Sequence, residues 1–348
     1  MPTTLTPTAA AVPSLRRRPR RRRVIWLLVL VAFVAVAAVL SVTLGARSVS
    51  INDIWAGLSG NVDTASAAAV AKRVPRTFLA LLIGAALAIA GTVMQGVTRN
   101  PLADPQILGI NGGASLAVVV GLAFFGITDA FGYIWLAMLG AAVAAVFVYT
   151  VGSLGRGGAS PLKLALAGAA TAVAFTSLIS AILLPRIDVM SVFRFWQIGG
   201  VGGASPDKIL LVIPFLLVGA VICFASAGGL NSLALGDDLA AGLGERVQTA
   251  RLLAAVGAVI LCGAATAVAG PIGFVGLIVP HVCRLLVGPD HRWLLPVSAL
   301  VGGGLLTIAD VVGRVIAPPQ EVEVGVVTAL IGAPFFIAIV RRQKMRAL

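Results

Sequence analysis

Residues 73–113 read RVPRTFLALLIGAALAIAGTVMQGVTRNPLADPQILGINGG, and this stretch decides how the rest of the chain is interpreted. From Thr77 to Thr98 the stretch carries no charge, which is enough for a helix to cross a bilayer, since a crossing takes about 20 residues. A polar turn at residues 99–105 follows, and a second uncharged run begins at once. The stretch therefore predicts one membrane crossing, a tight turn and a return crossing.

The turn at residues 99–105 contains two prolines, which separates it from an arbitrary polar loop. Asn100 precedes Pro101 and Asp104 precedes Pro105, and such pairs favour turns. Proline fixes its own φ angle and restricts the residue before it, so the turn should hold one shape. Two interpretations stay open from the residues alone: a short connection kept tight for helix packing, or a shaped surface used as a gate or for docking.

The whole chain has the composition of an integral membrane protein. Its 348 residues are 59% hydrophobic and 11% charged, with a mean hydropathy of +1.04, whereas an average soluble domain is about 25% charged. Helices are the expected spanning elements, because lipid offers no partner to an open backbone. We predict an all-α protein with about ten crossings, at residues 24–44, 77–98, 107–126, 133–151, 162–184, 209–227, 252–269, 272–287, 294–315 and 324–340.

The distribution of charge predicts the orientation of the chain in the membrane. The net charge is +13, and seven arginines lie between Arg16 and Arg23, directly before the first crossing. This placement is the positive-inside signal, so it indicates membrane orientation and no nucleic-acid partner. Ten crossings then put both termini in the cytoplasm. We expect a disordered basic tail at residues 1–23 and a single membrane domain at 24–348. The first apolar run is too long for a signal peptide.

The polar residues do not suggest a metal, cofactor or nucleotide site. Cys223, Cys262 and Cys283 lack paired metal spacing, and His281 and His291 are too few to form one. A phosphate-binding loop needs lysine after glycine, and none of the four lysines follows a glycine. Any energy from ATP must therefore come through another subunit.

Two similar strings of small residues suggest an internal repeat. Gly84–Gly91 reads GAALAIAG and Gly263–Gly270 reads GAATAVAG, and small residues let helices approach closely in lipid. With five crossings in each half, a duplicated unit would be inverted in the membrane. Chance recurrence in a chain rich in glycine and alanine is the alternative.

Residues 236–244, which read GDDLAAGLG, predict a short amphipathic helix on the inner face. Asp237 and Asp238 suit a helix N-terminus, Leu239 and Leu243 lie one turn apart, and Gly244 can end the helix. Such a helix could lie on lipid or dock into a soluble partner. Helices that lie on lipid carry Lys and Arg on their polar side, so the two acids favour docking.

Several spaced motifs of the chain resemble the FecCD-type permease family. Members of that family are membrane subunits of bacterial ATP-driven importers for iron–siderophore complexes, haem and cobalamin. The resemblance runs from about residue 26 to 343 and includes Arg73-x-Pro75-Arg76, Gln95, Asn100-Pro101-Leu102-Ala103-x-Pro105, Gly270-Pro271-Ile272-Gly273-Phe274 and Val279-Pro280-His281. One departure is Glu323, because the family usually has proline just before Val324 and Gly325.

The resemblance implies three sets of site residues. The inner gate and translocation path would include Asn100, Leu102, Ser160, Pro161, Leu162 and Trp196. The segment 236–244 would be the helix that couples to the ATPase through Asp237, Asp238, Leu239, Ala240, Leu243 and Gly244, with aspartates in place of two family glutamates. An external binding protein would dock on Arg73, Arg76 and Arg314. For these arginines, pairing with Asp310, Glu321 or Glu323 is the open alternative.

The resemblance also implies a function and a set of partners. The chain would have the type II ABC importer permease fold in the bacterial plasma (inner) membrane, without a cofactor or an enzymatic activity of its own. A second permease subunit, identical or similar, would enclose the path with it, and two ATP-binding subunits and a solute-binding protein would complete the importer. An iron–siderophore complex is the expected cargo, with cobalamin or haem as alternatives. An ion-coupled transporter needs ionisable groups near the membrane midplane, and Asp310 lies towards the outer end of its crossing.

Overall fold

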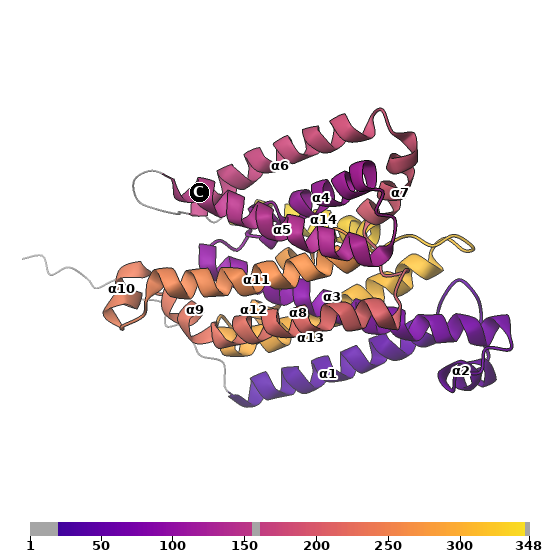
Figure 1. The fold of residues 1–348 in the computed structure, drawn as a ribbon. Coiled ribbons are helices and arrows are strands. Elements are labelled where there is room, and N and C mark those ends of the chain that lie inside the picture. The colour runs from indigo at the N-terminus through magenta and orange to yellow at the C-terminus, as the bar shows by residue number, and fades with distance from the viewer. Residues whose placement is uncertain (1–19, 155–160, 345–348) are drawn as a thin grey trace, which may run out of the picture.

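The computed structural model describes residues 20–154 and 161–344, and this part of the chain is helical without any strand. Figure 1 shows the helices running side by side as one bundle. In chain order they are α1 (Arg20–Thr43), α2 (Ile51–Leu58), α3 (Ala65–Thr98), the 3-10 turn η1 (Pro105–Leu108), α4 (Ile110–Phe125), α5 (Ala130–Ser153), α6 (Pro161–Leu183), α7 (Ile187–Ile198), α8 (Pro206–Ala225), α9 (Ala227–Leu233), α10 (Asp237–Gly242), α11 (Val247–Ala269), α12 (Val275–Val287), α13 (His291–Val315) and α14 (Val324–Lys344).

Each of the ten predicted crossings corresponds to one helix, which confirms the all-α membrane fold. Among the described residues, seven helices are long and apolar enough to span a bilayer by themselves: α1, α3, α5, α6, α8, α11 and α13. The other three, α4, α12 and the Val324–Ala338 part of α14, are shorter apolar helices. Helix α1 begins at Arg20, so the last residues of the predicted disordered tail are helical, and residues 1–19 lie outside the described part.

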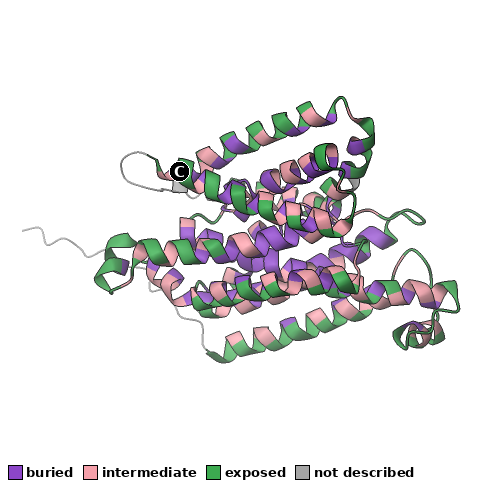
Figure 2. Cartoon of the chain, viewed as in Figure 1, coloured by how far each residue is buried: buried purple, intermediate pink, exposed green. Residues whose placement is uncertain are grey.

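Helix α3 is the central helix of the bundle. It packs against α1, α11, α12 and α13. In its apolar 18-residue stretch 78% of the residues are buried, whereas in that of α1 only 17% are buried. Figure 2 shows buried residues gathered along the middle of the bundle and exposed ones along α1. The predicted small-residue face explains the close packing, because a Cβ at Gly84 would come within 2.2 Å of the Gly302 carbonyl oxygen.

Helix α3 also begins much earlier than the predicted crossing at residue 77. Thr64 caps it by accepting a hydrogen bond from the Ala67 N–H, and Pro75 lies inside the helix. The added turns project beyond the bundle and pack against α2 (Figure 1). Arg73 and Arg76 therefore lie on α3 itself and not on a loop before it.

Helices α4 and α12 each follow a turn that folds back into the bundle. Gly109 before α4 has φ 71° and Phe274 before α12 has φ 69°, and the Gln106 side chain donates to the Ile272 carbonyl at 3.2 Å, which joins the two turns. The helix contacts of the two halves correspond to each other. The α3–α13 contact matches the α11–α5 contact, and the α4–α5 contact matches the α12–α13 contact. Two inverted copies of a five-helix unit would give this pairing. The repeat itself stays a prediction.

Candidate functional site

The predicted inner turn at residues 99–105 is held together by its own side chains. Arg99 ends α3 in the left-handed conformation, at φ 51°. The Asn100 side chain accepts from the Leu102 N–H at 2.9 Å, and Asp104 accepts from the Gln106 N–H at 2.9 Å, capping η1. These hydrogen bonds, together with the two prolines, favour a single shape for the turn. Leu102 is half-buried and the neighbouring Ala103 is buried.

Asp104 lies deeper in the protein than the sequence suggests. It was expected in a cytoplasmic loop, but its carboxylate lies beside Gly276 at the start of α12, 3.5 Å from where a Cβ would stand there. The turn therefore re-enters the bundle before α4 begins. The signal for this depth was present in the apolar residues that flank Asp104 on both sides.

The second loop of the predicted gate is only partly visible. Ser160 lies outside the described residues. Pro161 begins α6, and Leu162 is exposed. The juxtaposition of this loop with Leu102 stays a prediction.

Trp196 packs inwards near the end of α7. Its indole N–H lies 3.5 Å from the Ala267 carbonyl of α11, and its ring lies 6.0 Å from that of Phe193. The next residues join three elements, because the Gly200 N–H donates to Ala269 and the Gly325 N–H donates to Gly199. Trp196 thus marks the junction of α7, α11 and α14, and its place in the path stays a prediction.

The short amphipathic helix expected at residues 236–244 is present as α10, which spans only Asp237–Gly242; its coupling role stays a prediction. Gly236 precedes it with φ 110°, and Leu243 and Gly244 form its end. Leu239 and Leu243 are 62% and 68% exposed, whereas Ala240 is fully buried against the bundle. The helix therefore presents an apolar patch, Leu239 and Leu243, that no described residue covers.

The two acids of α10 differ in their surroundings. Asp237 pairs with Arg251 of α11 at 3.1 Å and also with Arg99 at the end of α3. Asp238 is exposed. Neither arginine partner could be predicted from the sequence, since no local pattern connects Arg99 or Arg251 to α10.

Arg73 and Arg314 are internal. Arg73 donates to the carbonyls of Val42 and Thr43 at 3.2 and 3.0 Å, and Arg314 donates to Ser41 at 2.9 Å. They are 7% and 1% exposed, and they serve the end of α1, whose last carbonyls have no partner within the helix. Burial therefore disfavours the predicted docking role for both. Arg314 pairs with Asp310, as the alternative expected, whereas the hydrogen bonds of Arg73 go to backbone carbonyls.

Arg76 joins three parts of the outer end. Its guanidinium forms a fork on Asp310 of α13, with Nη2 2.8 Å from Oδ1 and Nε 3.1 Å from Oδ2, and it binds Glu321 of the next loop at 2.5 Å. Asp310 is also paired with Arg314 at 3.1 Å. Forked Arg–carboxylate pairs are strong and directional. The Arg76 side chain is 11% exposed, and its docking role stays a prediction.

Glu323, the departure from the family pattern, faces this ion-pair network. Its Oε2 is buried and has no hydrogen-bond partner among the described residues. Burial raises the pKa of Glu323 above its ordinary value, although the nearby Arg76 opposes the shift. The side chain lies against Gly200, where an added Cβ would collide with it.

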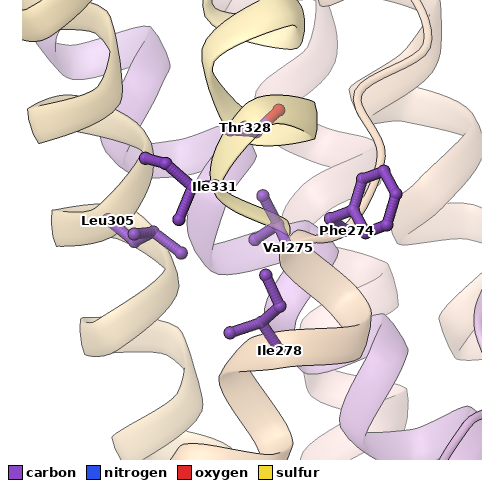
Figure 3. Close-up of a pocket in the computed structure, with 6 residues that line it drawn as sticks. All are labelled: Phe274, Val275, Ile278, Leu305, Thr328 and Ile331. Atoms are coloured by element: carbon purple, nitrogen blue, oxygen red, sulfur yellow. The ribbon is translucent and has the colours of Figure 1, made fainter. Parts of the chain in front are cut away.

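A small apolar cavity lies between α12, α13 and α14 (Figure 3). Its volume of about 10 Å³ leaves room for one water molecule at most. The walls are almost wholly apolar, so this cavity is too small for a metal chelate and too apolar to order water. It is lined by Phe274, Val275, Ile278, Leu305, Thr328 and Ile331.

Comparison with known proteins gives one consistent result. The model of the FecCD transport family matches residues 30–342. The chain is 45% identical to the ferric enterobactin transport system permease protein FepD of Escherichia coli (strain K12), over 90% of this chain and 94% of that one. It is 41% identical to the iron(3+)-hydroxamate import system permease protein FhuB of Bacillus subtilis (strain 168), over 92% and 84% of the two chains.

Two further similarities extend the comparison. The hemin transport system permease protein HmuU of Yersinia pestis is 36% identical, over 92% of this chain and 95% of that one. A solved structure of an ABC transporter assigned to the metal-chelate type, in an inward-facing conformation, superposes with a TM-score of 0.80 at 29% identity. That match covers 92% of this chain and 99% of the other.

Proposed function

Because the chain belongs to the FecCD transport family and is a permease of the ABC importer class, we propose that it carries an iron–siderophore complex across the bacterial plasma membrane. The observation that carries this proposal is the 45% identity, over nearly the full chain, to a permease for ferric enterobactin. A relative for hydroxamate siderophores supports the same class of cargo. Hemin is the second candidate, since a hemin permease is 36% identical.

The proposed importer draws its energy from a separate ATP-binding subunit that docks on α10. The exposed Leu239 and Leu243 support this assignment, because an apolar patch beside acidic residues suits a protein partner better than lipid. The start of α1, the end of α14 and α10 lie at one end of the bundle, and α2 lies at the other (Figure 1). With the basic residues of α1 inside, both termini are cytoplasmic and α2 faces the binding protein.

A second permease subunit completes the path in this proposal. Helix α6 is only 22% buried along its span, and its outward face carries Thr176, Ser177 and Ser180 around an open hollow of about 420 Å³. Polar side chains gathered on one face of a crossing favour a water-filled cavity over lipid. Two copies of this chain, or this chain and a similar one, would enclose such a cavity between their α6 helices.

The test is uptake of radioactive iron by a strain that lacks its siderophore permeases and carries this chain with its ATP-binding and binding-protein subunits. Separate arms supply ferric enterobactin, a ferric hydroxamate and hemin. We expect uptake of at least one siderophore complex, and uptake that stops when ATP is depleted but persists with a protonophore. Uptake of hemin alone would make haem the cargo instead of an iron–siderophore complex. Uptake driven by the proton gradient would contradict the ABC mechanism.

A further inference from the structure

One carboxylate connects α10 to the inner turn. Asp237 is the first residue of α10, and Arg99 is the residue at which α3 gives way to the turn at 99–105. The Arg99 guanidinium pairs with Asp237 Oδ1. The same carboxylate accepts from Arg251 of α11 at 3.1 and 3.3 Å. Asp237 therefore lies between the surface proposed to meet the ATPase and the turn predicted to gate the path.

The α10 side of this contact is firmly held. Ala240 is fully buried, and the Glu245 N–H donates back to the Ala240 carbonyl at 3.0 Å. Arg251 is only 12% exposed in its side chain, so it fixes Asp237 to the body of α11. Helix α10 can therefore transmit a displacement, since its inner side is packed and not free.

The turn side of the contact is equally stiff. Arg99 adopts a left-handed conformation that is uncommon for residues other than glycine, which sets the direction in which its Cα–Cβ bond leaves the backbone. Only two residues separate Arg99 from Leu102, and the Asn100 side chain binds the Leu102 N–H. The Arg99 guanidinium is therefore connected to the backbone that carries Leu102 by a short and hydrogen-bonded segment.

We propose that the Arg99–Asp237 ion pair is a positioning contact that transmits movement of α10 to the turn carrying Leu102. The inference rests on the proposed function, because it requires an ATPase bound at α10. Both side chains are partly exposed, at 37% and 49%, and pairs of this kind contribute little to stability. Their loss should therefore change the coupling of the two elements while leaving the fold intact.

The test uses the complex of permease and ATP-binding subunit in lipid nanodiscs, with Leu102→Cys as a reporter that a maleimide can label. Cys223, Cys262 and Cys283 are buried, so the reporter should dominate the labelling. The measurement is the ratio of labelling rates with and without ATP. Arg99→Gln should reduce that ratio about two- to fivefold, the effect that one partly exposed pair can supply, while the ATP-binding subunit still co-purifies and hydrolyses ATP.

Further variants separate the ion pair from other effects. Asp237→Asn should reduce the ratio at least as much, because it also removes the pair with Arg251. Adding Arg99→Gln to it should reduce the ratio no further, because the Arg99–Asp237 interaction is already lost. Asp237→Glu keeps a carboxylate and should keep the ratio. Arg246→Gln removes an exposed arginine on the same face and serves as the matched control, with no change expected.

The possible failures can be told apart. If no ATP-binding subunit co-purifies with the unmodified permease, the proposed function is wrong. If it co-purifies and the labelling ratio is the same in Arg99→Gln and wild type, only the ion-pair inference is wrong. Strictly additive losses in the double variant would also overturn the inference, since Asp237 would then act independently of Arg99.

Discussion

Arg314 lies almost wholly inside the protein, although arginine is among the residues least often buried. Its guanidinium donates to the carbonyls of Ser41 and Leu44 at 2.9 and 3.1 Å, and Asp310 balances its charge. The arginine thus satisfies carbonyl groups at the end of α1 that lack partners within the helix. A buried cation with this set of acceptors is a structural clamp between α1 and α13.

We therefore expect Arg314→Ala to destabilise the permease. Removing one partner of a buried ion pair leaves the other charge unpaired in the apolar interior, which costs about 3–5 kcal/mol. Asp310 keeps Arg76, so a loss of about 2–3 kcal/mol is expected. Thermal unfolding in detergent would measure it, with the exposed Arg194→Ala as control. An unchanged melting temperature together with lost binding-protein docking would restore the docking role.

Glu323 predicts a pH dependence of stability. Burial raises its pKa above the ordinary 4.5, so the folded protein binds this proton more tightly than the unfolded chain does. The stability that Glu323 contributes is therefore full below pH 4.5 and is lost as the pH rises through the raised pKa. In thermal scans between about pH 4 and pH 8, the melting temperature of Glu323→Gln should rise relative to that of wild type as the pH rises. Parallel curves would show that Glu323 is solvated or paired.

At the scale of elements, variants of α10 can test docking of the ATP-binding subunit separately from folding of the permease. Leu243 is 68% exposed, so Leu243→Arg should leave the permease in the membrane at normal yield. It should abolish co-purification of the ATP-binding subunit, because a charge would enter an apolar contact without a partner. Ala240→Arg changes a fully buried residue of the same helix and should instead lower the yield. Normal co-purification with Leu243→Arg would place the docking surface elsewhere.

The sequence could predict the helices of this protein better than their ends. Hydropathy indicated all ten crossings because each needs an apolar run, whichever neighbours it has. It placed the start of the second crossing after the charges of Arg73 and Arg76, but α3 begins before them, at Ala65. Asp310, Glu321 and backbone carbonyls accept the hydrogen bonds of the two side chains. Helix α2 was missed, although Ser50 and Asp53 form a capping box that local reasoning could have found.

Some features of the candidate sites could also be predicted from the sequence, and others could not. The amphipathic helix at α10 and the shaped turn at 99–105 follow from local residue chemistry, so the sequence predicted both. The Arg99–Asp237 pair and the burial of Arg314 depend on which helices become neighbours, and local patterns carry no information on that. For the same reason, the sequence could offer internal pairing of the outer arginines only as an alternative to docking.

At the scale of the whole molecule, the bundle depends on how closely its central helix meets its neighbours. Gly84 faces Gly302 of α13, and Gly91 faces Gly276 of α12, so backbone meets backbone on two sides of α3. In lipid, helices gain little from burying apolar surface against each other, and close packing of small residues replaces that driving force. These contacts set the position of α3, and hence of the turn that follows it.

Gly91 is therefore the most sensitive of these positions. A Cβ there would come within 2.0 Å of the Gly276 carbonyl oxygen, and backbone cannot move aside as a flexible side chain can. We expect Gly91→Ala to cost about 1–3 kcal/mol, as overpacked cores do, and Gly91→Leu to prevent correct folding. Gly242→Ala is the matched control, because nothing lies within 4 Å of a Cβ at that position. Fluorescence-detected size-exclusion profiles and melting temperatures would measure both, and equal values for Gly91→Ala and Gly242→Ala would show that α3 is not held at the Gly91–Gly276 contact.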